Sequence, residues 1–254
     1  MKESLTLEVC CNSLNSAVAA YRGGANRIEL CDNLLEGGTT PSLSSIRIIR
    51  DLVNIPIHVL IRPRGGDFLY DPVEMRQILL DIQCCRELQI DGIVVGMLDE
   101  SGNLDKDNFH RVVSAAGEDM SITFHRAIDM SKDPYSLLNE LKLYKTVDRV
   151  LTCGLSMDLK TRVENLSRMR EIVGDDIKVM VGGGVNQTNV EEVIKKARIS
   201  EIHFSGKGYR KSNMMFQNKN IAMGGNDPEL EFSILETKKE NVEKMKNILD
   251  KIER

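Results

Sequence analysis

The chain has 254 residues, 41% apolar and 28% charged, a composition that supports a sizeable core and excludes global disorder. Its 34 basic and 38 acidic residues give a net charge of −4, which argues against the broad basic surface of a nucleic-acid-binding protein. No apolar run approaches the roughly 20 residues that cross a bilayer, and the first residues lack a signal peptide's apolar stretch. We therefore expect a cytoplasmic protein without membrane or nucleic-acid partners, whose six cysteines are reduced thiols.

Short apolar runs alternate with segments of helical period along the chain. The predicted strands span residues 5–11, 27–31, 57–62, 92–98, 121–126, 149–153, 177–181 and 201–205. Predicted helices between them include residues 42–52, 72–88, 159–173 and 190–197. A repeated strand–helix order indicates parallel strands, because parallel pairing needs a crossover. Eight strands in about 250 residues favour an α/β fold, a single (β/α)8 TIM barrel, over an open doubly wound sheet.

No linker or change in composition divides the chain, so we predict one domain over residues 1–254. Residues 206–231 show no clear period and form a predicted long loop after the last strand. This loop is either a lid over the barrel mouth, or a surface excursion or a subunit contact. A predicted C-terminal helix over residues 236–252 covers the outside of the barrel.

The first two predicted strands share a Glu-x-Cys pattern, Glu8 with Cys10 and Glu29 with Cys31. Residues two apart in a strand share a face. Since the outer face of a barrel strand packs on apolar helices, these polar pairs should point to the barrel axis. If the two patterns align, Cys10 and Cys31 lie within a few ångströms, although barrel shear can offset them. Two such thiolates can hold Cu(I); equally, both can be small apolar core residues.

Other strands add polar groups that an ordinary barrel core does not need. Such groups are costly inside a fold unless they pair or meet water, so their concentration at one end indicates a site. The set consists of His58, Arg62, Arg64, His125, Arg126, Asp129, His203 and Ser205. The seventh strand ends in a run that includes Gly183 and Gly184, and loops at this position bind phosphate in many barrels. The same glycines can also simply permit a tight turn.

Several longer strings in the sequence are similar to the CutC family, which is named for copper homeostasis. They are residues 8–10, 24–31, 37–42, 61–68, 123–127 and 182–185, and the resemblance covers nearly the whole chain. The resemblance implies a cytosolic TIM barrel that forms a homodimer or homotetramer and binds Cu(I) through Cys10 and Cys31. One departure is Cys153, which stands where many members have serine and adds a third thiol near the mouth.

Two functions follow as alternatives. In the first, a copper homeostasis protein binds Cu(I) at Cys10 and Cys31, with Glu8 and Glu29 as neighbouring charges. In the second, the chain is a lyase, isomerase or hydrolase of a small phosphorylated or acidic metabolite. Its acid–base groups would come from Glu8, Glu29, His58 and His125. The predicted substrate-binding residues are Arg62, Arg64, Asp67, Arg126, Asp129, Gly183, Gly184, His203 and Ser205, with Arg62 and Arg64 holding the anionic group.

Overall fold

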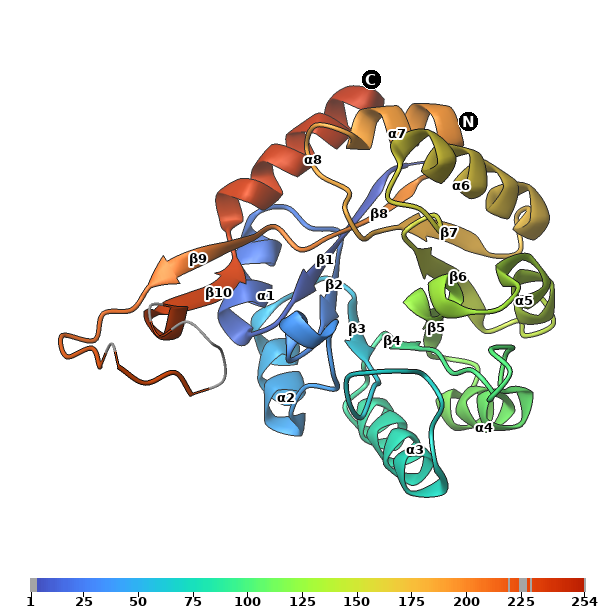
Figure 1. The fold of residues 1–254 in the computed structure, drawn as a ribbon, viewed down its shortest axis with the longest axis horizontal. Coiled ribbons are helices and arrows are strands. Elements are labelled where there is room, and N and C mark those ends of the chain that lie inside the picture. The colour runs from blue at the N-terminus through green and yellow to red at the C-terminus, as the bar shows by residue number, and fades with distance from the viewer. Residues whose placement is uncertain (1–3, 219, 224–227, 229, 254) are drawn as a thin grey trace.

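The computed structural model describes residues 4–218, 220–223, 228 and 230–253. Eight parallel strands close into a barrel in chain order, and the last strand pairs with the first (Figure 1). They are β1 (Thr6–Cys11), β2 (Arg27–Leu30), β3 (Ile57–Leu60), β4 (Gly92–Val95), β5 (Ser121–Phe124), β6 (Val147–Thr152), β7 (Lys178–Val181) and β8 (Glu201–Phe204). The predicted (β/α)8 barrel is therefore confirmed, because an open sheet would leave β1 and β8 unpaired.

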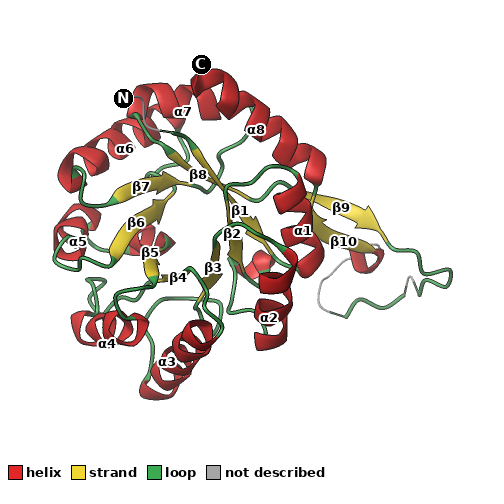
Figure 2. Cartoon of the chain, turned by 180° about the vertical axis from the view of Figure 1, so that it is seen from behind, coloured by secondary structure: helices red, strands yellow, loops and turns green. Residues whose placement is uncertain are grey.

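Eight α-helices among the described residues surround the barrel (Figure 2). They are α1 (Leu14–Arg22), α2 (Leu43–Leu52), α3 (Pro72–Glu87), α4 (Lys106–Ala116), α5 (Pro134–Leu141), α6 (Leu159–Val173), α7 (Val190–Ala197) and α8 (Lys239–Glu253). Local sequence explains where α3 begins: Asp71 accepts hydrogen bonds from the N–H groups of Val73 and Glu74, and Pro72 occupies the first turn. None of the described helices is long and apolar enough to cross a membrane.

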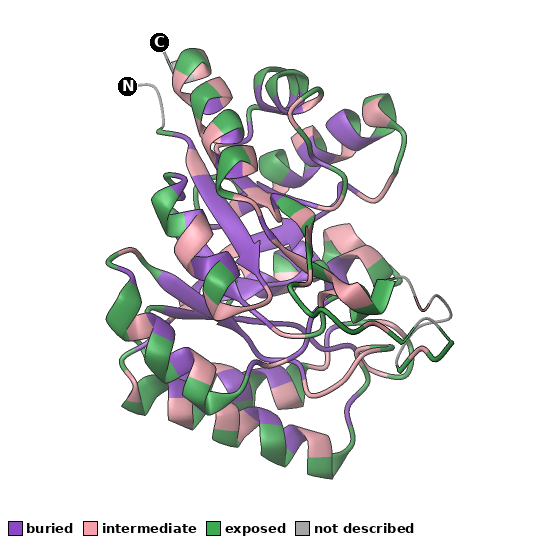
Figure 3. Ribbon diagram, turned by 90° about the vertical axis from the view of Figure 1, so that its left-hand side faces the viewer, coloured by how far each residue is buried: buried purple, intermediate pink, exposed green. Residues whose placement is uncertain are grey.

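The strands divide their side chains between an apolar outer layer and a polar interior. Val9 and Ile28 point outward into the layer between strands and helices, and both are fully buried. Glu8 and Glu29, on the opposite faces of the same strands, are also buried. Figure 3 shows that buried residues concentrate in the strands. Most of the buried apolar residues thus lie outside the barrel, whereas its interior holds the polar groups together with a small cluster of Cys10, Cys31, Leu60 and Val94.

The segment after β8 differs from its prediction. Residues 207–211, predicted as loop, form β9 (Lys207–Lys211), which pairs antiparallel with β10 (Ser233–Thr237) in a hairpin that projects beyond α1 (Figure 1). The predicted C-terminal helix begins at 239 instead of 236, because β10 takes residues 236–237. Residues 219, 224–227 and 229 of the predicted loop lie outside the described residues. Of the described loop residues, Gly206 and Lys207 line the barrel pocket, and the lid and the subunit contact both stay predictions.

Candidate functional site

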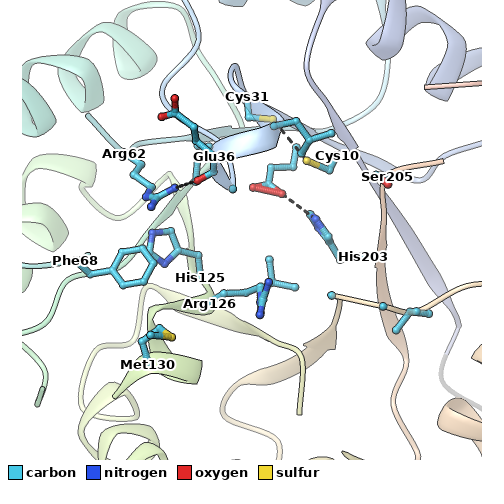
Figure 4. Close-up of a pocket in the computed structure, with 18 of the residues that line it drawn as sticks. Cys10, Cys31, Glu36, Arg62, Phe68, His125, Arg126, Met130, His203 and Ser205 are labelled. Carbon is cyan, nitrogen blue, oxygen red and sulfur yellow. Dashed lines mark hydrogen bonds and ion pairs between the residues drawn. The ribbon is translucent and has the colours of Figure 1, made fainter. Parts of the chain in front are cut away.

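A pocket of about 1420 Å³ opens at the C-terminal ends of the strands. Figure 4 shows that its lining comes from distant parts of the chain, including Cys10 and Cys31 on one side and His125, Arg126 and His203 on the others. This is the end of the barrel at which the side chains from successive loops meet in TIM-barrel proteins.

The two predicted thiols meet in this pocket. The Sγ atoms of Cys10 and Cys31 lie 3.6 Å apart, and both residues are buried. The shear of the barrel offsets the two Glu-x-Cys patterns by two residues, since Cys10 is paired with Glu29 in the sheet. The sulfurs still meet, because strand side chains lean along the strand direction. The hydrogen bond to Cys31, together with burial, raises the pKa of the Cys10 thiol well above its usual value.

His203 lies beside the thiols and joins the two glutamates. Its Nδ1 is 2.8 Å from Oε1 of Glu8, and its Nε2 is 3.3 Å from Oε2 of Glu29. One donor atom each from Cys10, Glu29 and His203 lie within 4.8 Å of one another. A carboxylate bound to the far nitrogen of a histidine is the usual partner of a metal-binding imidazole. These three donors, with Cys31 adjoining, form a candidate metal centre.

The two glutamates have opposite electrostatic environments. Burial alone would raise the pKa of Glu8, but Arg27 and His203 outweigh it and hold that pKa well below the ordinary value. Burial raises the pKa of Glu29 to about 7, against the attraction of His203. Burial disfavours a charged His203, yet Glu29 and Glu8 together raise the pKa of its imidazole. Glu8 is therefore a fixed carboxylate, whereas Glu29 and His203 can exchange protons near neutral pH.

A layer of ion pairs supports this site from below. Arg27 binds both Glu8 and Glu201, and Arg149 Nε lies 3.2 Å from Glu201 Oε2. The charges of two arginines and two glutamates thus neutralise one another inside the barrel, which lowers the free-energy cost of burying them. Arg27, Arg149 and Glu201 are not among the residues predicted from the sequence. Strand alternation indicates two of them, because Arg27 stands two residues before Glu29 and Glu201 stands two residues before His203, both predicted to face the interior.

Comparison with known proteins identifies the family. The sequence model of the CutC family matches residues 5–208. The chain belongs to the CutC family. A protein from Bacteroides fragilis named as a family protein CutC is 39% identical over 247 residues, covering 97% of this chain and 95% of that protein. A copper homeostasis protein cutC homolog from Homo sapiens is 40% identical over 228 residues, covering 90% of this chain and 83% of that protein.

Solved structures agree with the family and the fold. A crystal structure from Streptococcus agalactiae, named as a CutC copper homeostasis protein, has a TM-score of 0.75 and 28% identity, covering 79% of this chain and 98% of that one. A thiamine phosphate pyrophosphorylase from Pyrococcus furiosus has a TM-score of 0.54 at 16% identity, covering 98% of this chain and 96% of that one. At that identity the second likeness extends to the fold alone.

In this CutC family member, neither histidine predicted as an acid–base group forms a hydrogen bond with Glu8 or Glu29, and of these two glutamates Glu29 lines the pocket and Glu8 does not. His58 is buried, with Nδ1 4.0 Å from Glu8 Oε2, and is not among the pocket-lining residues. His125 lines the pocket, but its Nδ1 accepts a hydrogen bond from the N–H of Ala127. Burial lowers the pKa of each imidazole to about 3, so both are neutral near pH 7. The histidine in contact with Glu8 and Glu29 is His203, predicted only as a ligand-binding residue.

Arg62 and Arg64, both predicted to hold an anion, have different hydrogen-bond partners in the structure. Arg62 is buried and donates to the carbonyl groups of Glu36, Gly38 and Gly66, so it ties two loops together at the pocket wall. Arg64 turns to Glu74, 2.5 Å away, and is not among the lining residues. Loop carbonyls and a helix-cap carboxylate cannot be assigned as partners from sequence spacing, because they come together only when the loops fold.

The remaining predicted residues differ in whether they line the pocket. Arg126, Gly183, Gly184 and Ser205 line the pocket, as does Asp67, whose own carboxylate is largely exposed. Asp129 is not a lining residue. Its carboxylate accepts hydrogen bonds from the hydroxyl of Thr152, the N–H of Cys153 and Nε of Arg126, so it fixes the geometry of the pocket wall at Arg126. The buried Cys153 lies behind Gly183 and is not a lining residue either.

Proposed function

We propose that this CutC family member is a cytosolic protein that binds Cu(I) through Cys10 and Cys31, as a homodimer or homotetramer. The observation that carries the proposal is the 3.6 Å separation of the two Sγ atoms in an open pocket. Thiolates are soft ligands that suit Cu(I). The names of the human and Streptococcus agalactiae relatives, both copper homeostasis proteins, support it independently.

The surroundings of the thiols supply what the binding of a metal ion requires. A thiol must lose its proton to become a ligand. Glu29 contacts Cys10 and has a pKa raised to about 7, so its carboxylate can accept that proton. Nε2 of His203 lies within reach as a third donor, and Glu8 holds the ring from the other side. We infer that copper displaces the Cys10 proton and that Glu29 accepts this proton and passes it to solvent.

An anaerobic Cu(I) titration against a chromophoric chelator tests this assignment. We expect the wild type to bind one ion per chain, and Cys10→Ser and Cys31→Ser to bind it at least about 100-fold more weakly, because each loses a thiolate ligand. Cys84→Ser is the matched control, since Cys84 lies on α3 away from the pocket lining, and it should bind as the wild type does. Equal affinity in all four proteins would refute the proposal.

The size of the pocket favours a second candidate function, that of an enzyme. A volume of about 1420 Å³ accommodates an organic molecule as well as an ion. Glu29 and His203 lie at its floor with pKa values raised from their ordinary values, and they are 3.3 Å apart. In this reading Glu29 removes a proton from a small anionic substrate and His203 returns one. Glu29→Gln would then abolish turnover while Cys31→Ser would not, and turnover that survives in Glu29→Gln would exclude Glu29 as the base.

A further inference from the structure

The loop that follows β7 lies between two arginines that come from other elements. A Cβ placed on Gly183 would lie 3.3 Å from Cζ of Arg126, and one placed on Gly184 would lie 3.1 Å from Nη2 of Arg162. Arg126 begins the 3₁₀ helix η2 (Arg126–Met130), and Arg162 belongs to α6. Both glycines have positive φ angles, 62° and 95°. The close approach of the guanidinium groups to the loop thus depends on the missing side chains.

Arg162 is a buried cation with no carboxylate partner among the described residues. The residue is only 2% exposed, and its guanidinium donates to the carbonyl groups of Ser156 (3.2 Å) and Gly183 (2.9 Å). None of the carboxylates in the described part of the chain forms an ion pair with it. Burying a guanidinium is costly when no acid neutralises it. The loop at Gly183 and Gly184 separates this positive charge from the pocket, so the charge attracts an anion held on the pocket side of the loop.

The hydrogen bonds behind the loop orient its peptide groups. The carbonyl of Gly183 is held by Arg162, and that of Gly184 by Nδ2 of Asn189 at 3.0 Å. In a trans peptide the N–H points opposite to the carbonyl, and none of the described peptides is cis. The N–H groups of Gly184 and Val185 therefore point away from Arg162 and Asn189. Neither has an acceptor among the described residues, and both residues line the pocket.

Arg126 presents a second cationic side chain to the same loop, from the side of the pocket. In Figure 4 it lies between His125 and His203. Its side chain is half exposed, and its Nε donates to Asp129 at 2.8 Å. A guanidinium carries five N–H donors, and the other four have no oxygen acceptor among the described residues. One wall of the pocket thus offers two backbone donors and one cationic side chain, with a second cation directly behind them.

We propose that the loop Gly183–Val185, together with Arg126 and Arg162, binds the phosphate group of a small phosphorylated molecule. Successive backbone N–H groups in a positive-φ turn form a concavity suited to an anion. A phosphate has enough oxygens to accept from both amides and from the Arg126 guanidinium at once, whereas a carboxylate has two. The site does not depend on Cu(I), because its residues come from η2, α6 and the β7 loop, and it specifies the substrate class for the second candidate function.

Calorimetric titration of the full chain with inorganic phosphate tests the site, at constant ionic strength and with acetate in a parallel titration. We expect saturable phosphate binding by the wild type and a weakening of about tenfold or more in Arg126→Gln, since a charge-assisted hydrogen bond is lost. Arg126→Lys keeps the positive charge but loses the bidentate geometry of the guanidinium, so its affinity for phosphate should lie between those of the wild type and Arg126→Gln. Circular dichroism of each variant confirms that it is folded.

Arg64→Gln is the matched control. Arg64 and Asp67 form the same i,i+3 ion pair as Arg126 and Asp129, but Arg64 lies outside the pocket lining. This variant should bind phosphate as the wild type does. The titrations use metal-free protein, so failure of the copper proposal leaves their outcome unchanged. No saturable binding by the wild type, equal affinity in Arg126→Gln, or acetate binding as strong as phosphate binding would each overturn the inference.

Discussion

Oε1 of Glu8 lies 2.8 Å from Nδ1 of His203, and this contact sets the chemistry of the pocket floor. Arg27 and His203 lower the pKa of Glu8 although burial opposes them, so Glu8 is a carboxylate and can only accept a hydrogen bond. Nδ1 of His203 is therefore the donor. Nε2 is left to face Glu29 and Cys10, where it can bind a metal ion or exchange a proton.

We expect Glu8→Gln to lower the free energy of unfolding by about 3 kcal/mol, because it leaves the buried Arg27 with one carboxylate fewer. Urea denaturation followed by circular dichroism measures the change. Glu191→Gln is the control, since Glu191 forms an exposed i,i+4 pair with Lys195 whose loss costs at most about 0.5 kcal/mol. Similar losses in the two variants would show that the ion pairs inside the barrel do not support the fold.

Stability should depend on pH through Glu29. Burial raises its pKa from 4.5 to about 7, so between these values the folded chain retains a proton that the unfolded chain releases. The contribution of Glu29 is therefore complete below pH 4.5, is lost as pH rises to about 7, and stays constant above that. The unfolding free energy of the wild type minus that of Glu29→Gln should fall over this window, by at most about 1.4 kcal/mol per pH unit.

This comparison is made on metal-free protein with a chelator present. His58 and His125, whose lowered pKa values of about 3 give the opposite trend, are present in both proteins and cancel in the difference. A difference that is independent of pH would mean that Glu29 titrates normally in the folded chain.

The affinity for Cu(I) should rise with pH. The pKa of Cys10 is raised by its hydrogen bond to Cys31 and by burial, so copper must displace a proton to bind there. We expect the apparent association constant to increase about tenfold per pH unit for each thiol that is deprotonated on binding. Chelator competition at several pH values between 6 and 8 measures the slope. Cys31→Ser should reduce that slope, and an affinity that does not change with pH would exclude thiolate ligation.

Gly96→Ala should destabilise the barrel wall at His125. A Cβ at residue 96 would lie 2.6 Å from Cε1 of the His125 ring and 3.0 Å from Cβ of Ala127, and both residues are buried. Overpacking of this kind costs about 1–3 kcal/mol, measurable as a lower melting temperature. Gly208→Ala is the control, because its Cβ would meet only the flexible Lys238 side chain. A melting temperature equal to that of the control would show that the His125 ring can shift.

Sequence periodicity determined the strands and the faces of their side chains. The predicted strand 201–205 corresponds to β8 at Glu201–Phe204, and the alternation in Glu8-Val9-Cys10 placed the glutamate and cysteine inside the barrel. Period-two alternation is a local property, so it can be read without knowing which strands become neighbours. The same period-two alternation places Arg27 and Glu201 on the interior faces of their strands, and their ion pairs form the layer below the site.

Contacts between side chains from distant strands were decided only by the tertiary structure. Glu8 meets His203 because β8 closes the barrel against β1, which joins residues 195 positions apart. Arg62 binds loop carbonyls, and Arg162 lies behind a loop from the next strand, because the loops pack together only around a closed barrel. The sequence by itself thus determined the barrel and which side chains enter it. Closure and register decided which of these side chains touch, because they depend on pairing between strands far apart in the chain.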